Sequence, residues 1–250
     1  MKDLIIADIT RIFRKPTYRI AMLVCFALAI IWAIRTKMNV WNGYTFVSSQ
    51  ADALNICGYI LGISIYISVY ADEFTSNSMQ CLIGHGVSRF RLLLAKFIDC
   101  VIVTGVSFFI YWFFTMMLNL ALGAGINSYE LKFFCGLVMV WALKALGYAT
   151  FSMIVLYWTK NVILATFMDV LMLFAAGSLL SFLNQIPILK FYHLQNYIFE
   201  GMLTDAHASL QLGQAEGWLW ILFAIVRICV FSIVVSFLLF RKKELDFNNF

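Results

Sequence analysis

Charged residues and prolines are scarce in this sequence of 250 residues: only 12% are Asp, Glu, Lys or Arg, and there are two prolines. Soluble domains carry about 25% charged residues, so a soluble globular domain is excluded. Hydrophobic residues make up 63% of the chain. Because its apolar runs are long enough for helical spans, the sequence predicts an all-α integral membrane protein.

Motifs for catalysis are absent as well. The sequence has no GxxxxGK[ST] loop to hold phosphates, so the chain does not itself bind ATP in the usual way. It also lacks the HExxH and GxSxG motifs of hydrolytic enzymes. We therefore expect neither enzyme activity nor a cofactor bound by this chain. Energy for a transport function would come from a partner or from an ion gradient.

Cysteine and histidine patterns give no metal site. None of the six cysteines forms a CxxC pair, which argues against a disulfide framework or a metal cluster. They are interpreted as small side chains buried among apolar ones. His193 and His207 lie fourteen residues apart without a carboxylate at a matching spacing, so we predict no metal bound there.

Six apolar runs approach the roughly 20 residues that a helix needs to cross about 30 Å of hydrocarbon. A preceding segment, residues 1–15, has apolar residues on one side of a helix and charged residues on the other, and ends before Pro16. It predicts an amphipathic interfacial helix, or a helix packed on a partner. Gly58 and Gly62 form a GxxxG that would let another helix approach closely. The predicted spans are 18–34, 53–70, 97–122, 133–158, 162–182 and 217–240.

Basic residues are distributed unevenly between the two sides of these spans. Twelve Lys and Arg residues fall in the N-terminal segment, the loops after spans two and four, and the tail, against four on the opposite side. The positive-inside rule therefore places both termini in the cytoplasm. The net charge of +5 is explained by this orientation and does not call for a nucleic-acid partner.

The external segment 184–216 is too broken to span and too apolar for a free loop. We expect short helices that lie on or dip into the outer leaflet, as a lid over an exit path.

Ionisable residues also lie inside or beside the spans, where facing lipid is costly. Asp99 is near the start of span three, whereas Lys144 and Arg227 are near mid-membrane. Asp169 lies in span five and would pair with Arg227 or Lys144. These charges either line a pathway or pair and snorkel between packed helices, and the sequence leaves both readings open.

The polar stretch 72–96 separates spans two and three. It reads Glu73, Ser78-Met79, Leu82-Ile83, Val87-Ser88-Arg89 and a leucine-rich run that ends in Ala95-Lys96. This order resembles the first cytoplasmic loop of ABC-2 type permeases, the membrane subunits of ATP-binding-cassette exporters. The chain departs from that pattern at Asn77-Ser78-Met79, where the family has Gly-Thr-Leu, and at Gly86, where it has Pro. Without the resemblance, the stretch is equally well read as a loop that only sets topology.

The resemblance implies that residues 1–250 form one ABC-2 type transmembrane domain and that the loop carries a coupling helix for a separate ATPase. The coupling residues would be Glu73, Met79, Leu82, Ile83 and Arg89. It also implies two ATPase subunits that hold ATP and Mg²⁺, and a second permease copy or a paralogue, in a bacterial cell membrane. The substrates would be amphipathic or antimicrobial peptides. The alternatives are an ion-coupled secondary transporter that uses Asp169 and Lys144 as a proton relay, and a membrane scaffold that transports nothing.

Overall fold

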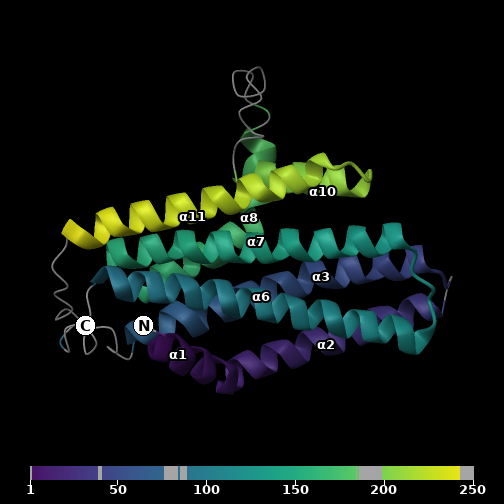
Figure 1. Ribbon diagram of the computed structural model, residues 1–250, viewed down its shortest axis with the longest axis horizontal. Coiled ribbons are helices and arrows are strands. Elements are labelled where there is room, and N and C mark those ends of the chain that lie inside the picture. The colour runs from purple at the N-terminus through teal and green to yellow at the C-terminus, as the bar shows by residue number, and fades with distance from the viewer. Residues whose placement is uncertain are drawn as a thin grey trace.

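Long helices run along a common axis in the computed structural model of the chain (Figure 1). The structure describes residues 2–38, 41–75, 84, 89–183, 185 and 199–242. The first helix and the end of the last lie at the same end of the bundle, on the left in Figure 1. The described residues form helices and no strands, so the predicted all-α class is confirmed. The helices are α1 (Lys2–Arg14), α2 (Pro16–Lys37), α3 (Gly43–Tyr66), η1 (Ile67–Ala71), α4 (Asp72–Thr75), α6 (Arg89–Leu122), α7 (Ser128–Thr159), α8 (Val162–Leu183), α10 (Phe199–Gln211) and α11 (Glu216–Lys242).

Local signals in the sequence set several helix ends. Pro16 opens α2, where its fixed φ is favourable and its missing N–H costs nothing. The Asn42 side chain accepts the backbone N–H of Thr45 at 2.8 Å and so caps α3. Lys160 adopts the left-handed conformation, with φ of 59°, and ends α7. As the short connection predicts, α7 and α8 pack against each other.

Four of the described helices are long and apolar enough to cross a membrane, which makes this a multi-pass membrane protein. The helix α8 contains a shorter apolar stretch, Val162–Ser178. The helix α11 is 27 residues long. The six-span topology stays a prediction. The four spanning segments are Pro16–Lys37, Gly43–Ala71, Phe90–Leu122 and Ser128–Thr159.

The predicted close approach at Gly58 and Gly62 is confirmed, and its main partner is α7. A Cβ built at Gly58 would lie 2.2 Å from the ring of Trp141, and one at Gly62 would lie 3.1 Å from Leu173 of α8. Trp141 also donates its indole N–H to Asn55 at 3.1 Å, and its ring meets the Tyr59 ring edge-on at 5.0 Å. The small residues therefore let α3 pack closely between α7 and α8.

Cys25, Cys57, Cys100 and Cys135 are free thiols, and the first three are buried. Cys25 of α2 and Cys57 of α3 each direct the sulfur towards the other's backbone carbonyl, at 3.8 and 3.6 Å. Three of these four cysteines are buried, as predicted, whereas Cys135 is half-buried. Cys81 and the Cys229 side chain lie outside the described residues.

Candidate functional site

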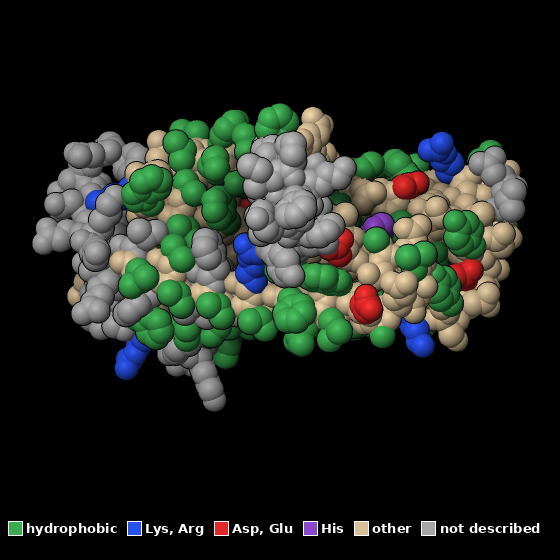
Figure 2. Space-filling view, turned by 90° about the horizontal axis from the view of Figure 1, so that it is seen from above, with side chains coloured by type: hydrophobic (Ala, Val, Ile, Leu, Met, Phe, Trp, Pro, Cys, Tyr) green, Lys and Arg blue, Asp and Glu red, His purple; other side chains and the backbone are tan. Residues whose placement is uncertain are grey.

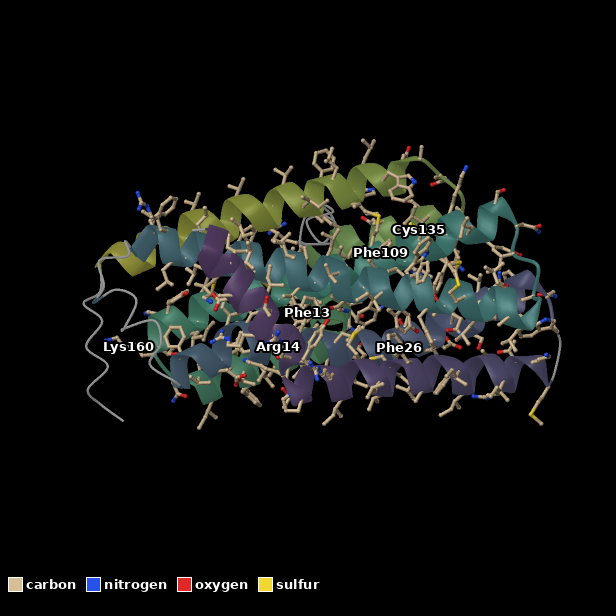
Figure 3. The ribbon with its side chains drawn as sticks, turned by 60° about the horizontal axis from the view of Figure 1, so that its bottom comes forward. Phe13, Arg14, Phe26, Phe109, Cys135 and Lys160 are labelled. Carbon is tan, nitrogen blue, oxygen red and sulfur yellow. The ribbon has the colours of Figure 1, made fainter. Side chains whose placement is uncertain are left out.

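The helix α1 is joined to the bundle by a buried ion pair. Lys96 of α6, with a side chain only 1% exposed, contacts the carboxylate of Asp8 in α1. Asp99, one helical turn further along α6 and fully buried, lies 3.5 Å from the same ammonium. Figure 3 shows α1 crossing α6, with Phe13 and Arg14 close to the turn into α2. The predicted residue Asp99 is thus part of an ion-pair cluster that holds α1 in place.

A second ion pair ties the end of α1 to the end of span two. The Lys15 ammonium lies 2.6 Å from the Asp72 carboxylate and donates to the backbone carbonyl of Ser68 at 3.0 Å. Ser68 belongs to η1, a stretch of π-helix. Such wide turns are rare and often mark functional positions. Lys15 thus binds a carbonyl of the π-helix and a carboxylate of α4 together.

Tyr70 of η1 adds a contact between span two and α6. Its hydroxyl, fully buried, donates to the backbone carbonyl of Lys96 at 3.5 Å. The two ion pairs and this hydrogen bond form a group of contacts that ties α1 to η1 and α4 on one side and to α6 on the other. We call this group the N-terminal ion-pair cluster; its members are Asp8, Lys15, Tyr70, Asp72, Lys96 and Asp99.

This cluster refines the reading of segment 1–15 as an interfacial helix. The helical-wheel argument puts Asp8 on the polar side and Ile6 on the apolar side. In the structure Asp8 is 9% exposed, whereas Ile6 is 63% exposed. Ile12, one turn after Asp8, is 1% exposed. The stripe that packs on the bundle therefore runs through Asp8 and Ile12, because an acidic residue with a buried lysine as partner can lie on the packed face.

The N-terminal ion-pair cluster lies on both sides of residues 76–88 in the chain. Its side chains tie α4, which ends before this segment, and α6, which begins after it, to the N-terminal helix. Of the predicted coupling residues, Glu73 lies in α4 and Arg89 begins α6, but their side chains lie outside the described residues. Met79, Leu82 and Ile83 also lie outside them.

A second polar cluster lies at the middle of the bundle. The Lys144 ammonium is 2.8 Å from one carboxylate oxygen of Glu200, and the Tyr148 hydroxyl donates to the other at 2.5 Å. Lys144 also lies 5.0 Å from the centre of the Trp141 ring, a favourable cation–π arrangement. We call Lys144, Tyr148 and Glu200 the central ion-pair cluster. Lys144 lies halfway along α7, and its side chain is 13% exposed.

The expected pairing of Lys144 with Asp169 is wrong, because Glu200 holds Lys144. Asp169 is 0% exposed in α8, and neither of its oxygens has a hydrogen bond within the described part of the chain. Its polar neighbours are Ser152 and Tyr66. Arg227, which was the other expected partner, has an exposed side chain on α11.

The helix α10 carries Glu200 into the bundle. Its first residue, Phe199, fills the space beside Gly147 of α7, where an added Cβ would lie 2.3 Å from the ring. At its other end Leu210 fits against Gly136 in the same way, at 2.5 Å. Phe199 and Leu210 are eleven residues apart on α10, and their partners Gly147 and Gly136 are eleven residues apart on α7 in the opposite order. The helix α10 therefore runs antiparallel along the middle of α7. The helix belongs to the segment 184–216 that was predicted to dip, and it reaches the middle of α7.

Sequence reasoning missed Glu200. The sequence does show an acidic residue inside an apolar stretch. Polar residues interrupt that stretch, however, so counting residues does not show how deep in the bundle Glu200 lies. Asp8 was also missed as a buried partner, because its position on a helical wheel does not show that Lys96 of another helix lies beside it. Within the described ranges, no group of three or more His, Cys, Asp or Glu residues could hold a metal ion.

Comparison with known proteins gives one informative match. A family model described as a protein of unknown function, DUF2705, matches residues 4–245. No curated protein matches the chain.

Proposed function

The chain belongs to the DUF2705 family, and we propose that it is the permease subunit of an ATP-driven ABC exporter, with ATP hydrolysed by a separate subunit. The observation that carries this proposal is the N-terminal ion-pair cluster. It joins α1, α4 and α6 around the loop whose residue order resembles the coupling loop of ABC-2 type permeases. A segment that only set topology would not need its two flanking helices tied to a third element by ion pairs, one of which is buried.

The cluster supplies a route for mechanical coupling. When two ATPase subunits close on ATP and Mg²⁺, they displace a helix docked in their groove. Displacement of the segment 76–88 would pull on α4 and α6. Because Lys15 holds α4 and Lys96 holds Asp8 of α1, the three elements would move together. The π-helix η1 lies directly before α4, and a wide turn of this kind gives span two a place to bend.

The transport pathway would form between two such subunits, either two copies or one copy and a paralogue. The chain supplies long apolar helices, which suit substrates that reach the pathway from the membrane itself. We propose amphipathic or antimicrobial peptides as this substrate class, and a bacterial cell membrane with both termini in the cytoplasm as the location. The central ion-pair cluster would hold α10 beside the pathway.

The ion-coupled alternative rests on Asp169 and Lys144 acting as one proton relay. In the structure Lys144 is engaged by Glu200 at 2.8 Å, and Asp169 has Ser152 and Tyr66 as its polar neighbours. No contact joins the two relay residues within the described part of the chain, and the relay therefore loses its main geometric support.

The test is purification of the tagged protein from its native membranes, with the subunits that accompany it identified by mass spectrometry and assayed for ATP hydrolysis. We expect an ABC ATPase. The triple variant Met79→Ser, Leu82→Ser, Ile83→Ser should lose it, because apolar anchors at interfaces typically cost about 2 kcal/mol or more each when truncated. The loss in affinity should exceed about tenfold.

The matched control is Leu212→Ser, which alters an exposed apolar residue between α10 and α11 (71% exposed). It should leave ATPase binding unchanged. An ATPase that stays bound to the triple variant at the wild-type level would overturn the coupling assignment, and a protein that purifies with no ATPase at all would overturn the exporter proposal.

A further inference from the structure

A cavity of about 250 Å³ lies at the end of the bundle away from α1. It is formed where the first turns of α3 and α7 meet the last turns of α10. Sites for drug-sized ligands measure about 300–1,000 Å³, so this cavity suits one chemical group rather than a whole ligand. The side chains that give it chemical character are Tyr44, Asp52, Tyr129, Glu130, Phe133 and His207.

The charge of the cavity is negative. Asp52 contributes one carboxylate and Glu130 another. Oε2 of Glu130 accepts the backbone N–H of Asn127 at 2.8 Å, which fixes this carboxylate at the first turn of α7. Burial lowers the pKa of the His207 imidazole below its usual value, which disfavours a positive charge on this side chain. Figure 2 shows several separate acidic side chains over this half of the molecule, with Lys or Arg side chains at its edges.

Aromatic rings make up much of the remaining wall. Tyr44 and Tyr129 are exposed, at 68% and 53%, and the ring of Phe133 lies 6.1 Å from that of His207. Carboxylates together with ring faces are the combination that recognises organic cations, because the ring quadrupole and the carboxylate charge both attract them. Arg35 of α2 does not line this cavity; it lines an adjoining one that shares Tyr44 and Asp52.

A metal ion fits this cavity less well. Hard divalent cations such as Ca²⁺ take six to eight oxygen ligands, whereas two carboxylates line this cavity and one of them already accepts a backbone N–H. Within the described ranges no three His, Cys, Asp or Glu side chains converge closely enough to hold a metal ion. The aromatic rings also occupy positions in the wall where a metal ion would need oxygen ligands.

We propose that this cavity binds one alkylammonium or guanidinium group of a cationic amphipathic peptide, with Asp52 and Glu130 as its charge partners and the rings of Tyr44, Tyr129 and Phe133 around it. The inference rests on the proposed export of amphipathic peptides and deepens it by giving the charge that the peptides must carry. Because His207 and Gln211 of α10 line the same cavity, a bound peptide would contact the helix that carries Glu200 to the central ion-pair cluster.

The test measures binding by the purified full-length chain in nanodiscs of neutral phosphatidylcholine, without nucleotide and without an ATPase. The probe is a fluorescein-labelled synthetic peptide of Leu and Lys, compared with the same peptide carrying acetylated lysines. We expect the acetylated peptide to bind at least about fivefold more weakly. Asp52→Asn and Glu130→Gln should each weaken binding of the lysine peptide about fivefold and leave the acetylated one unchanged.

Glu216→Gln is the matched control, since it removes an equal charge from the first turn of α11 at the same end of the bundle, outside the cavity. It should bind the lysine peptide as the wild type does. Equal affinity for both peptides, or equal losses in Glu216→Gln and Asp52→Asn, would overturn the site. Displacement of the lysine peptide by millimolar Ca²⁺ would also overturn it, in favour of a metal site. Because no ATPase is present, these outcomes are independent of whether the chain works as an ABC permease.

Discussion

Lys144 of α7 and Glu200 of α10 form an ion pair with 2.8 Å between nitrogen and oxygen, although 56 residues separate them in the chain. Both side chains are largely buried, at 13% and 11% exposure. The pair fixes the start of α10 at the middle of α7. A charge that would be costly inside a membrane is thereby compensated by a carboxylate from another helix.

This ion pair gives a first prediction. Lys144→Met and Glu200→Gln should each lower the thermal stability of the detergent-solubilised protein, since removing one member leaves the other charge buried. In the double variant the losses should not add, and the coupling energy should be about 0.5–3 kcal/mol. A double-mutant cycle of melting temperatures measures this value. Strictly additive losses would show that the two residues do not interact.

The N-terminal ion-pair cluster predicts an order of severity. Lys96→Met removes the cation that Asp8 and Asp99 share, whereas Asp8→Asn leaves Asp99 at 3.5 Å from the ammonium. The lysine variant should therefore lose about 3–5 kcal/mol, and Asp8→Asn clearly less. Chemical denaturation of the purified protein gives both values. Equal losses, or a larger loss for Asp8→Asn, would contradict the shared role of Lys96.

Gly58 predicts the effect of a single methyl group. Gly58→Ala would place a carbon 2.2 Å from the Trp141 ring, and that ring is held by Asn55, Tyr59 and Lys144. We expect a loss of about 1–3 kcal/mol from overpacking. Gly105→Ala in α6 is the control: nothing lies within 4 Å of its added carbon, so it should be neutral or stabilise by up to about 1 kcal/mol. Melting temperatures of the two variants measure this difference.

Asp169 gives a prediction on function. Because its oxygens have no hydrogen bond within the described part of the chain, Asp169→Asn strands no charged partner. Membrane abundance and melting temperature should stay near those of the wild type, whereas efflux of the fluorescent Leu/Lys peptide from cells should fall if this carboxyl takes part in a pathway or a switching contact. Loss of folded protein in quantitative blots would instead assign Asp169 a structural role.

Orientation is tested with single cysteines in a cysteine-free background. Met38 and Leu212 are 82% and 71% exposed and lie at the end of the bundle away from α1. Cysteines at these two positions should react with a membrane-impermeant thiol reagent added to intact cells, and a cysteine at Ser76 should not, because the positive-inside rule places that loop in the cytoplasm. Labelling of Ser76 in intact cells would reverse the orientation.

Sequence alone determined the class of protein and most helix positions. Scarce charge and long apolar runs are properties of composition, and every span must be apolar over a fixed length, so each of the first four predicted spans falls within a long apolar helix. The helix starts were less well predicted, because α3 begins at Gly43 and α6 at Arg89, ahead of the predicted starts at residues 53 and 97. Local chemistry determined helix ends such as Pro16 and Asn42, because a cap or a missing N–H acts within a few residues. The GxxxG at Gly58 likewise predicts a close contact, although not its partner.

Only the tertiary structure decided which charges meet. Asp8 pairs with Lys96 across 88 residues, and Lys144 pairs with Glu200 rather than with Asp169. Each pairing depends on the rotation and depth of two helices that pack side by side, and hydrophobic periodicity specifies neither the neighbour nor the depth of a short helix such as α10. The charged partner of a buried residue is set by packing between elements, and the sequence of one element carries no record of it.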